Sequence, residues 1–158
     1  MELKLLTVQT SAPYASICNI IPSAVQKLNY VVLNKYNLGD LLKAIGEVTV
    51  TKDVTVFEVC KPSQVAAILE RNAAFTPALL CRIFVFIDTV SNHTVIQYFR
   101  PTLVLQEFID SDLQTAAKQI ESDIEKLIQA AENSANLVQD RQDSKVEVQI
   151  IDNATNSE

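Results

Sequence analysis

The chain has 158 residues and a mass of 17.5 kDa, which predicts a single domain. Apolar residues make up 48% of it, enough for a full hydrophobic core, and the net charge is -6 at pH 7. Two glycines and one histidine exclude a glycine-rich phosphate loop and a site built from several histidines. Because an acidic chain lacks the positive surface that attracts nucleic acids and anionic membranes, we expect neither partner.

The three cysteines, Cys18, Cys60 and Cys81, are an odd number at wide spacing, and no two of them form a CxxC motif. This pattern is typical of small buried thiols in a reducing compartment. The longest nearly apolar run, residues 78–87, contains Arg82 and has about half the length that a membrane span needs. Since no signal peptide is visible, we expect a cytoplasmic protein.

Strands and helices are predicted to alternate over the first 71 residues. Pro22 should kink the first helix or begin a second one, because proline removes a backbone donor. Asp40 is expected to cap the second helix, and Gly46 to close it in the C′ position. The apolar spacing favours strands at residues 3–8, 30–37 and 47–60, and helices at residues 12–28, 41–45 and 64–71.

Two further apolar runs, residues 82–89 and 94–100, predict an antiparallel hairpin. Successive side chains of a strand point to opposite faces of its sheet. The first run would therefore present Ile83, Val85 and Ile87 on one face, and Phe84 and Phe86 on the other.

The face with Phe84 and Phe86 requires a cover. An uncovered apolar patch marks an interface, and two-fold pairing is the commonest form of association, so we expect a homodimer through these residues. The alternative is a monomer in which the short helices 41–45 and 64–71 cover this face.

The clearest element is a helix from about Ser111 to about Asn133. Ser111 and Gln114 have the spacing of a capping box. The fold class predicted is therefore α+β, with an antiparallel sheet packed on a long C-terminal helix and shorter helices between strands. The apolar stripe of this helix repeats every three or four residues and consists of Leu113, Ala117, Ile120, Ile124, Leu127, Ile128 and Ala131.

Residues 1–135 are assigned to this single domain, and residues 136–158 to an acidic, polar C-terminal extension. Within the extension, Val146, Val148 and Ile150 alternate with polar residues, which indicates an edge strand at 146–150.

The stretch from Thr55 to Leu127 resembles a known family in the order and spacing of its motifs. These are Val56-Phe57-Glu58-Val59-Cys60-Lys61-Pro62, then Ala78-Leu79-Leu80-Cys81-Arg82-Ile83-Phe84-Val85, then Arg100-Pro101-Thr102 after the hairpin, and a closing helix with Asp112, Leu113, Glu121 and Leu127. They are similar to the domain of unknown function family 302 (DUF302), although Lys61 and Leu80 replace its Asn and Pro. The resemblance implies a TATA-binding-protein-like helix-grip fold, a curved antiparallel sheet around a long C-terminal helix, and a homodimer. It implies no reaction.

Cys60 and Cys81 are the chemically suggestive pair, because one ends a predicted strand and the other begins one. If those strands are neighbours, the thiols could serve redox or sulfur-relay chemistry, with Lys61 and Arg82 favouring the thiolate. The alternative is that both thiols are buried packing residues. Two thiols are too few ligands for a closed zinc site, so no metal or other cofactor is expected.

Arg100 would bind an anion or, as we favour, pair with a carboxylate of the long helix. His93 is expected to be a solvated residue of the hairpin turn. With no catalytic residue assigned, the sequence favours a non-enzymatic binding or interaction domain, homodimeric, that holds a small apolar ligand between sheet and helix. The alternative is a thiol-dependent redox or sulfur-relay protein that uses Cys60 and Cys81.

Overall fold

Five strands form one antiparallel sheet in the computed structural model, which describes residues 5–46, 50–78, 80–106 and 108–155, with the backbone alone at 76–78 and 139–155. The strands are β1 (Leu5–Thr10), β2 (Val31–Asn37), β3 (Val54–Cys60), β4 (Cys81–Ile87) and β5 (Thr94–Phe99). Their order across the sheet is β1-β5-β4-β3-β2, and every neighbouring pair is antiparallel. The predicted hairpin is confirmed as β4 and β5.

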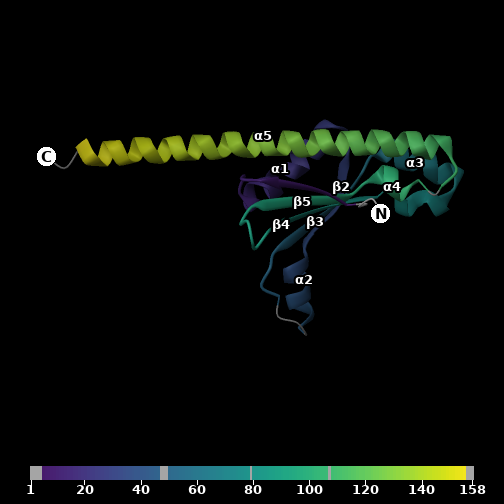
Figure 1. Cartoon of the computed structure of the whole chain (residues 1–158), viewed down its shortest axis with the longest axis horizontal. Helices are drawn as coiled ribbons and strands as arrows, with labels where there is room; N and C mark the ends of the chain where they lie inside the picture. Colours follow the sequence, from purple (N-terminus) through teal and green to yellow (C-terminus); the bar gives the residue numbers. More distant parts are fainter. Residues whose placement is uncertain (1–4, 47–49, 79, 107, 156–158) are drawn as a thin grey trace.

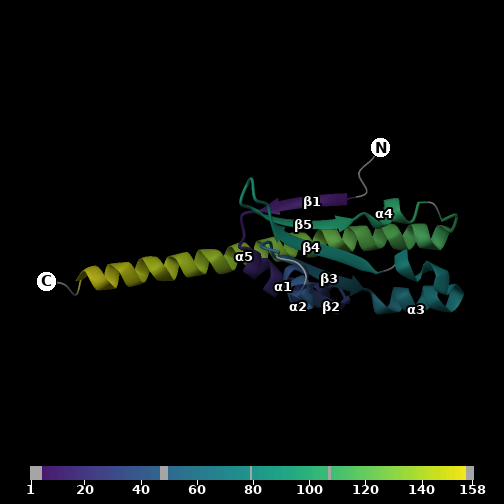
Figure 2. The same cartoon turned by 90° about the horizontal axis from the view of Figure 1, so that it is seen from below.

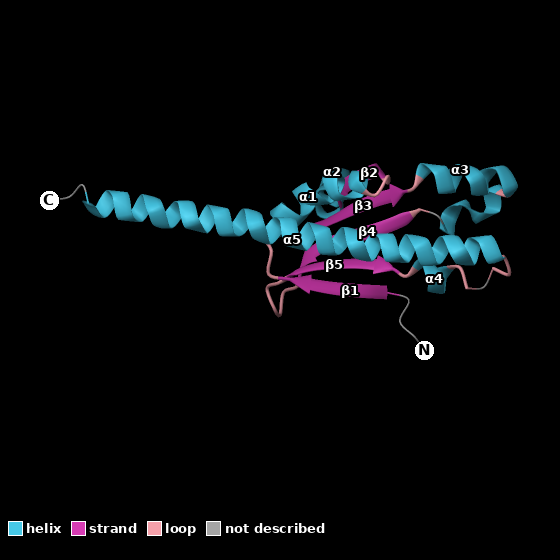
Figure 3. Cartoon of the chain, turned by 90° about the horizontal axis from the view of Figure 1, so that it is seen from above, coloured by secondary structure: helices cyan, strands magenta, loops and turns pink. Residues whose placement is uncertain are grey.

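One face of this sheet is covered by two helices. The helices of the chain are α1 (Tyr14–Lys27), α2 (Leu38–Ile45), α3 (Pro62–Arg71), α4 (Pro101–Val104) and α5 (Ser111–Thr155), with a 3-10 turn η1 at Ala73–Ala78. Helix α5 lies along the sheet, and α1 packs beside it on the same face (Figures 1 and 3). The predicted α+β class, with the sheet packed on a long C-terminal helix, is therefore confirmed.

The hydrophobic core lies between this face and the two helices. From β4 it takes Ile83 and Val85, which are fully buried, as the strand alternation predicts. From α5 it takes the whole predicted stripe, in which Leu113, Ala117, Ile120, Ile124, Leu127, Ile128 and Ala131 are all buried. Burial of the four large aliphatic side chains in its centre contributes about 6–12 kcal/mol before the loss of chain entropy is counted.

The other face of the sheet is largely uncovered by the described residues. Seen from below, the strands β1, β5 and β4 have no helix in front of them (Figure 2). Phe84 and Phe86 point to this face, where they are half-buried and pair with Val56 and Val54. Helix α2 contacts β2 and β3, whereas α3 packs against η1 beyond the sheet. The two short helices therefore leave much of this face open.

Pro22 does not divide α1, which is continuous from Tyr14 to Lys27. Proline has no N–H and leaves the carbonyl four residues earlier, that of Cys18, without its helical donor. The ammonium of Lys35 on β2 donates to this carbonyl oxygen at 3.4 Å. A side chain of the sheet thus replaces the missing hydrogen bond, and the helix continues through the proline.

Helix α2 begins at Leu38, earlier than predicted, and its cap is Asn37 instead of Asp40. The side-chain oxygen of Asn37 accepts a hydrogen bond from the Asp40 backbone N–H at 3.1 Å. Gly46 ends this helix in the left-handed conformation with φ of 86°, which confirms its predicted place.

Strand β3 begins at Val54, so the strand predicted over residues 47–60 is too long; residues 47–49 lie outside the described part of the chain. The Lys52 carbonyl oxygen lies 2.7 Å from the position that a Cβ on Gly39 would occupy. Asn37 Nδ2 also donates to Asp53 Oδ1 at 3.2 Å. The segment before Val54 therefore packs against α2 instead of extending the strand.

Helix α5 begins at Ser111 as predicted, but the predicted capping box does not form. Asp110 caps the helix, since its Oδ1 accepts the backbone N–H groups of Asp112 and Leu113, each at 3.0 Å. Gln114 Nε2 donates instead to the carbonyl oxygen of Leu105 at 2.7 Å. The Gln114 side chain thus bonds to the loop before α5 and does not form the capping-box hydrogen bond with the first residue of the helix.

The end of α5 lies far beyond the predicted Asn133, because the helix continues to Thr155. Residues 146–150, expected as an edge strand, belong to this helix. No glycine or proline occurs between Ser111 and Thr155, so no residue type that commonly ends a helix interrupts it. The last part of α5 projects past the sheet (Figure 1).

We predict that Ile124→Asp lowers the free energy of unfolding by several kcal/mol, because Ile124 is 1% exposed and the carboxylate would be buried without a partner. Urea denaturation followed by circular dichroism measures the change. Lys118→Asp on the exposed face of α5 is the control, with an expected change below about 1 kcal/mol. Equal losses in the two variants would contradict burial of the stripe.

Candidate functional site

A buried carboxylate, Asp123 of α5, gathers polar side chains near the end of β3. The Tyr30 hydroxyl donates to Asp123 Oδ2 at 3.1 Å, and Lys61 Nζ lies 3.3 Å from the same oxygen. Gln119 Nε2 donates to Asp123 Oδ1 at 2.8 Å. Burial and the Asp123 charge raise the pKa of Tyr30, so its hydroxyl remains a donor. The Lys61 charge is therefore directed to Asp123.

Cys60 and Cys81 lie near this cluster, at the facing ends of β3 and β4. The residue that pairs with Cys81 is Val59, so Cys60 is one residue out of register. Strand alternation then directs the two side chains to opposite faces of the sheet. Both thiols are free and buried. Burial raises the pKa of Cys60, and burial together with the Cys60 charge raises that of Cys81 to about 12.

The two arginines singled out from the sequence lie apart from these thiols. Arg82 Nε is 3.0 Å from Glu58 Oε1, in an exposed ion pair on the open face. Arg100 Nη2 is 2.8 Å from Glu121 Oε1 on α5, which confirms the favoured ion pair. His93 is exposed in the hairpin turn, as expected.

Glu121 is 6% exposed and accepts hydrogen bonds from the Arg100 guanidinium and from the Thr102 hydroxyl and backbone N–H. Burial by itself raises the pKa of Glu121, but these hydrogen bonds outweigh it and hold the pKa below its usual value. Glu121 thus remains ionised and ties α5 to the start of α4.

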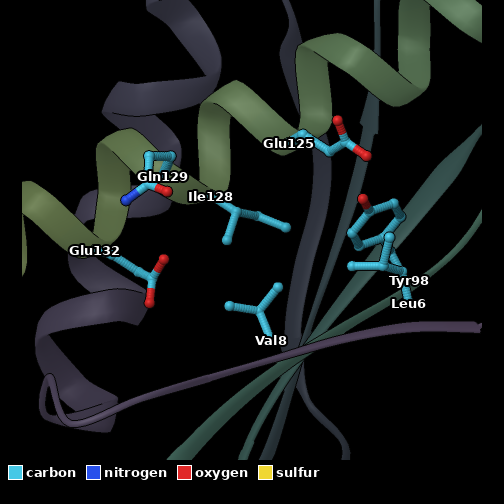
Figure 4. Close-up of a pocket in the computed structure, with 7 residues that line it drawn as sticks. All are labelled: Leu6, Val8, Tyr98, Glu125, Ile128, Gln129 and Glu132. Carbon is cyan, nitrogen blue, oxygen red and sulfur yellow. The ribbon is translucent and has the colours of Figure 1, made fainter.

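A pocket of about 190 Å³ lies between α5 and the strands β1 and β5 (Figure 4). Its apolar floor is formed by Leu6 and Val8 of β1 with Ile128 of α5. The polar side chains around it are Tyr98, Glu125, Gln129 and Glu132. The antiparallel pairing of Leu6 with Tyr98 and of Val8 with Ile96 brings these segments together.

Among the polar side chains of the pocket, that of Tyr98 is completely buried, with 0% exposure. Its hydroxyl has no hydrogen-bond partner among the described residues. Burial first, and then the charge of Glu125, raise the pKa of Tyr98. The hydroxyl is therefore neutral, can both donate and accept, and is directed toward Glu125 in Figure 4.

The sequence analysis assigned none of these residues to a ligand site, although Ile128 belongs to the predicted stripe of α5. The sequence did contain one signal for the pocket. Tyr98 is two residues after Ile96 in the second strand of the predicted hairpin, so both side chains point to the core face. A tyrosine in such a position normally needs a partner for its hydroxyl. The neighbours Leu6 and Val8 could not be assigned, since the pairing of β1 with β5 joins segments about 90 residues apart.

A five-stranded antiparallel sheet with a long C-terminal helix along one face defines an α+β domain. The residues from 6 to 131 match the model of a family described as "Domain of unknown function DUF302". The chain belongs to the DUF302 family, which confirms the resemblance in its motifs.

A crystal structure of an uncharacterised conserved DUF302 protein from Bacillus stearothermophilus has a similar fold, with a TM-score of 0.69. Its sequence is 21% identical, and the match covers 85% of this chain and 99% of that one. At this identity the likeness shows the fold alone. Among curated proteins none matches the chain. No helix of the described part has both the length and the apolar character that crossing a bilayer requires.

We predict that Glu121→Gln lowers the free energy of unfolding at pH 7 by about 1.5–3 kcal/mol, since it removes charged hydrogen bonds. Because the folded-state pKa of Glu121 is depressed, its stabilising contribution is complete above the unfolded-state pKa of about 4.3. The contribution is lost as the pH falls through the folded-state pKa. The stability difference between wild type and variant should therefore shrink below pH 4, as measured by urea denaturation. Asp112→Asn, in an exposed ion pair, should cost within about 0.5 kcal/mol.

We also predict that the native protein reacts with a maleimide at least about tenfold more slowly than the urea-unfolded chain. All three thiols are buried, and the pKa of each is raised, so little thiolate is accessible. Mass spectrometry of the labelled peptides reports each cysteine separately. Rapid native labelling of Cys60 or Cys81 would contradict this expectation and favour thiol chemistry.

Proposed function

We propose that this chain is a non-enzymatic binding domain that holds a small apolar ligand between its sheet and α5. The observation that carries the proposal is the pocket over Leu6, Val8 and Ile128, with the buried and unpartnered hydroxyl of Tyr98 at its side. A buried hydroxyl without a partner is destabilising, and a ligand with one polar group would relieve that cost.

The size of the pocket restricts the ligand. Drug-sized molecules occupy cavities of about 300–1,000 Å³, so about 190 Å³ suits a molecule with few heavy atoms. Its apolar floor suits a short hydrocarbon chain, and the carboxylates of Glu125 and Glu132 lie on the α5 side. Figure 4 shows Val8 and Ile128 facing each other across the space, with Glu125 beside Tyr98 and Glu132 on the other side of Ile128.

The alternative, a thiol-dependent redox or sulfur-relay protein, has less support. The thiols of Cys60 and Cys81 are buried, their pKa values are raised, and the Lys61 ammonium lies against Asp123. Redox and sulfur-transfer chemistry requires an accessible thiolate. Three free thiols also support a reducing, cytoplasmic location.

We predict that 1-hexanol binds the pocket and that Val8→Phe abolishes this binding. The larger ring would fill the space over Ile128, while half-buried Val8 on an edge strand leaves room for the fold to be kept. Two-dimensional NMR of the full chain should show shifts at Leu6, Val8 and Ile128 on titration with 1-hexanol.

Val31→Phe on β2 is the matched control, because it makes the same substitution at a 38% exposed site on the opposite edge of the sheet. This variant should retain binding. Shifts that spread over the surface, or that persist in folded Val8→Phe, would contradict the pocket as the binding site.

The second part of the proposal is a homodimer formed through the open face of the sheet. Phe84 and Phe86 are half-buried there, and Phe99 is 54% exposed on the same face of β5. Contiguous apolar side chains on an uncovered face are typical of an interface, and a two-fold pairing would bury both copies of the patch.

We predict a sedimentation mass near twice 17.5 kDa at micromolar concentration, falling to the monomer value in Phe84→Lys. Leu69→Lys on α3, at a residue 43% exposed and away from this face, should remain a dimer. A wild-type mass near 17.5 kDa that does not rise with concentration would exclude the dimer.

A further inference from the structure

We infer that the ligand of this pocket is an aliphatic amine, whose ammonium group lies between Glu125 and Tyr98 and whose hydrocarbon chain lies over Leu6, Val8 and Ile128. The inference rests on the proposed function and names the chemical class of its ligand.

The charge around the pocket is the first argument. Among the described residues that line it, the charged side chains are Glu125 and Glu132, with no lysine or arginine. Neither carboxylate forms an ion pair within the described part of the chain. The two lie seven residues apart, which is about two helical turns and about 10 Å along one side of α5. Such a site attracts a cation and repels an anion.

The Tyr98 hydroxyl is the second argument, independent of the carboxylates. Tyr98 lines the pocket, and its hydroxyl is buried and has no partner among the described residues. An ammonium has three donors and no acceptor, so it can donate to the Tyr98 oxygen and to a Glu125 carboxylate oxygen at once. Hydrogen bonds from charged donors are about twice as strong as neutral ones.

The apolar floor is the third argument, because it separates an amine from an inorganic cation. Leu6, Val8 and Ile128 offer no ligand to a metal ion, and the described residues contain no group of three metal-ligating side chains. A hydrocarbon chain would bury these side chains from water, whereas a hydrated ion would leave them exposed.

The test compares three probes with six carbon atoms each, n-hexylamine, 1-hexanol and hexanoate, titrated into the full chain at pH 7 and followed by NMR. We expect n-hexylamine to bind at least tenfold more tightly than 1-hexanol, and hexanoate to bind more weakly than either. The advantage of the amine should fall as salt is raised, since partly exposed charge pairs are screened.

Glu125→Gln should reduce the preference for amine over alcohol to less than threefold without changing 1-hexanol binding. Glu70→Gln, the same change at an exposed position of α3, is the matched control and should retain the preference. Tyr98→Phe preserves the ring and the fold, and should weaken n-hexylamine more than 1-hexanol.

The outcomes separate the two proposals. If 1-hexanol binds and n-hexylamine binds no more tightly, the pocket is confirmed and the amine is excluded. If neither binds, both proposals are wrong.

Nα-acetyl-lysine amide, which carries the same ammonium on a shorter chain, distinguishes the source of the amine. Binding as tight as that of n-hexylamine, or tighter, would assign the site to a lysine side chain. Weaker binding would assign it to a free amine.

Discussion

The structure depends on one packing constraint, which is that α5 buries its apolar stripe against a single face of the sheet. The stripe and the core faces of β4 and β5 together form a large part of the hydrophobic core, to which α1 also contributes. The remaining helices are shorter than α5, and α1 packs beside it on the same face of the sheet. The opposite face of the sheet, with Phe84 and Phe86, is left largely open by the described residues.

Two buried carboxylates determine where along the sheet α5 lies. Glu121 binds Arg100 and Thr102 at the end of β5, while Asp123 binds Tyr30 and Lys61 at the end of β3. Apolar packing by itself tolerates sliding, whereas a buried charge must find its partners. Lys61 and Arg100, which the sequence singles out for chemistry, therefore serve to anchor the helix. Because their charges are used in this way, Lys61 and Arg100 do not stabilise a thiolate at Cys60 or Cys81.

The pocket follows from the same arrangement. At the β1 edge, the α5 residues above the sheet change from large aliphatic side chains to Glu125, Gln129 and Glu132, which line the space without filling it. Leu6, Val8 and Tyr98 are left with an incomplete cover. An apolar floor, a buried hydroxyl and an acidic rim thus occur together because α5 covers the β1 edge of the sheet incompletely.

Much of the fold is a local property of the sequence. Periodicity predicted the hairpin, the α5 stripe and the start of α5, and the motifs from Thr55 to Leu127 identified the family. What local patterns could not determine was the partner of each polar group: Asn37 and Asp110 replaced the predicted caps, and Lys35 compensated for Pro22. The pocket was beyond prediction for the same reason, since it joins Leu6, Tyr98 and Ile128 from three distant segments. The spacing of apolar residues depends on the chain alone, but hydrogen-bond partners and cavities exist only after long-range strand pairing has brought those segments together.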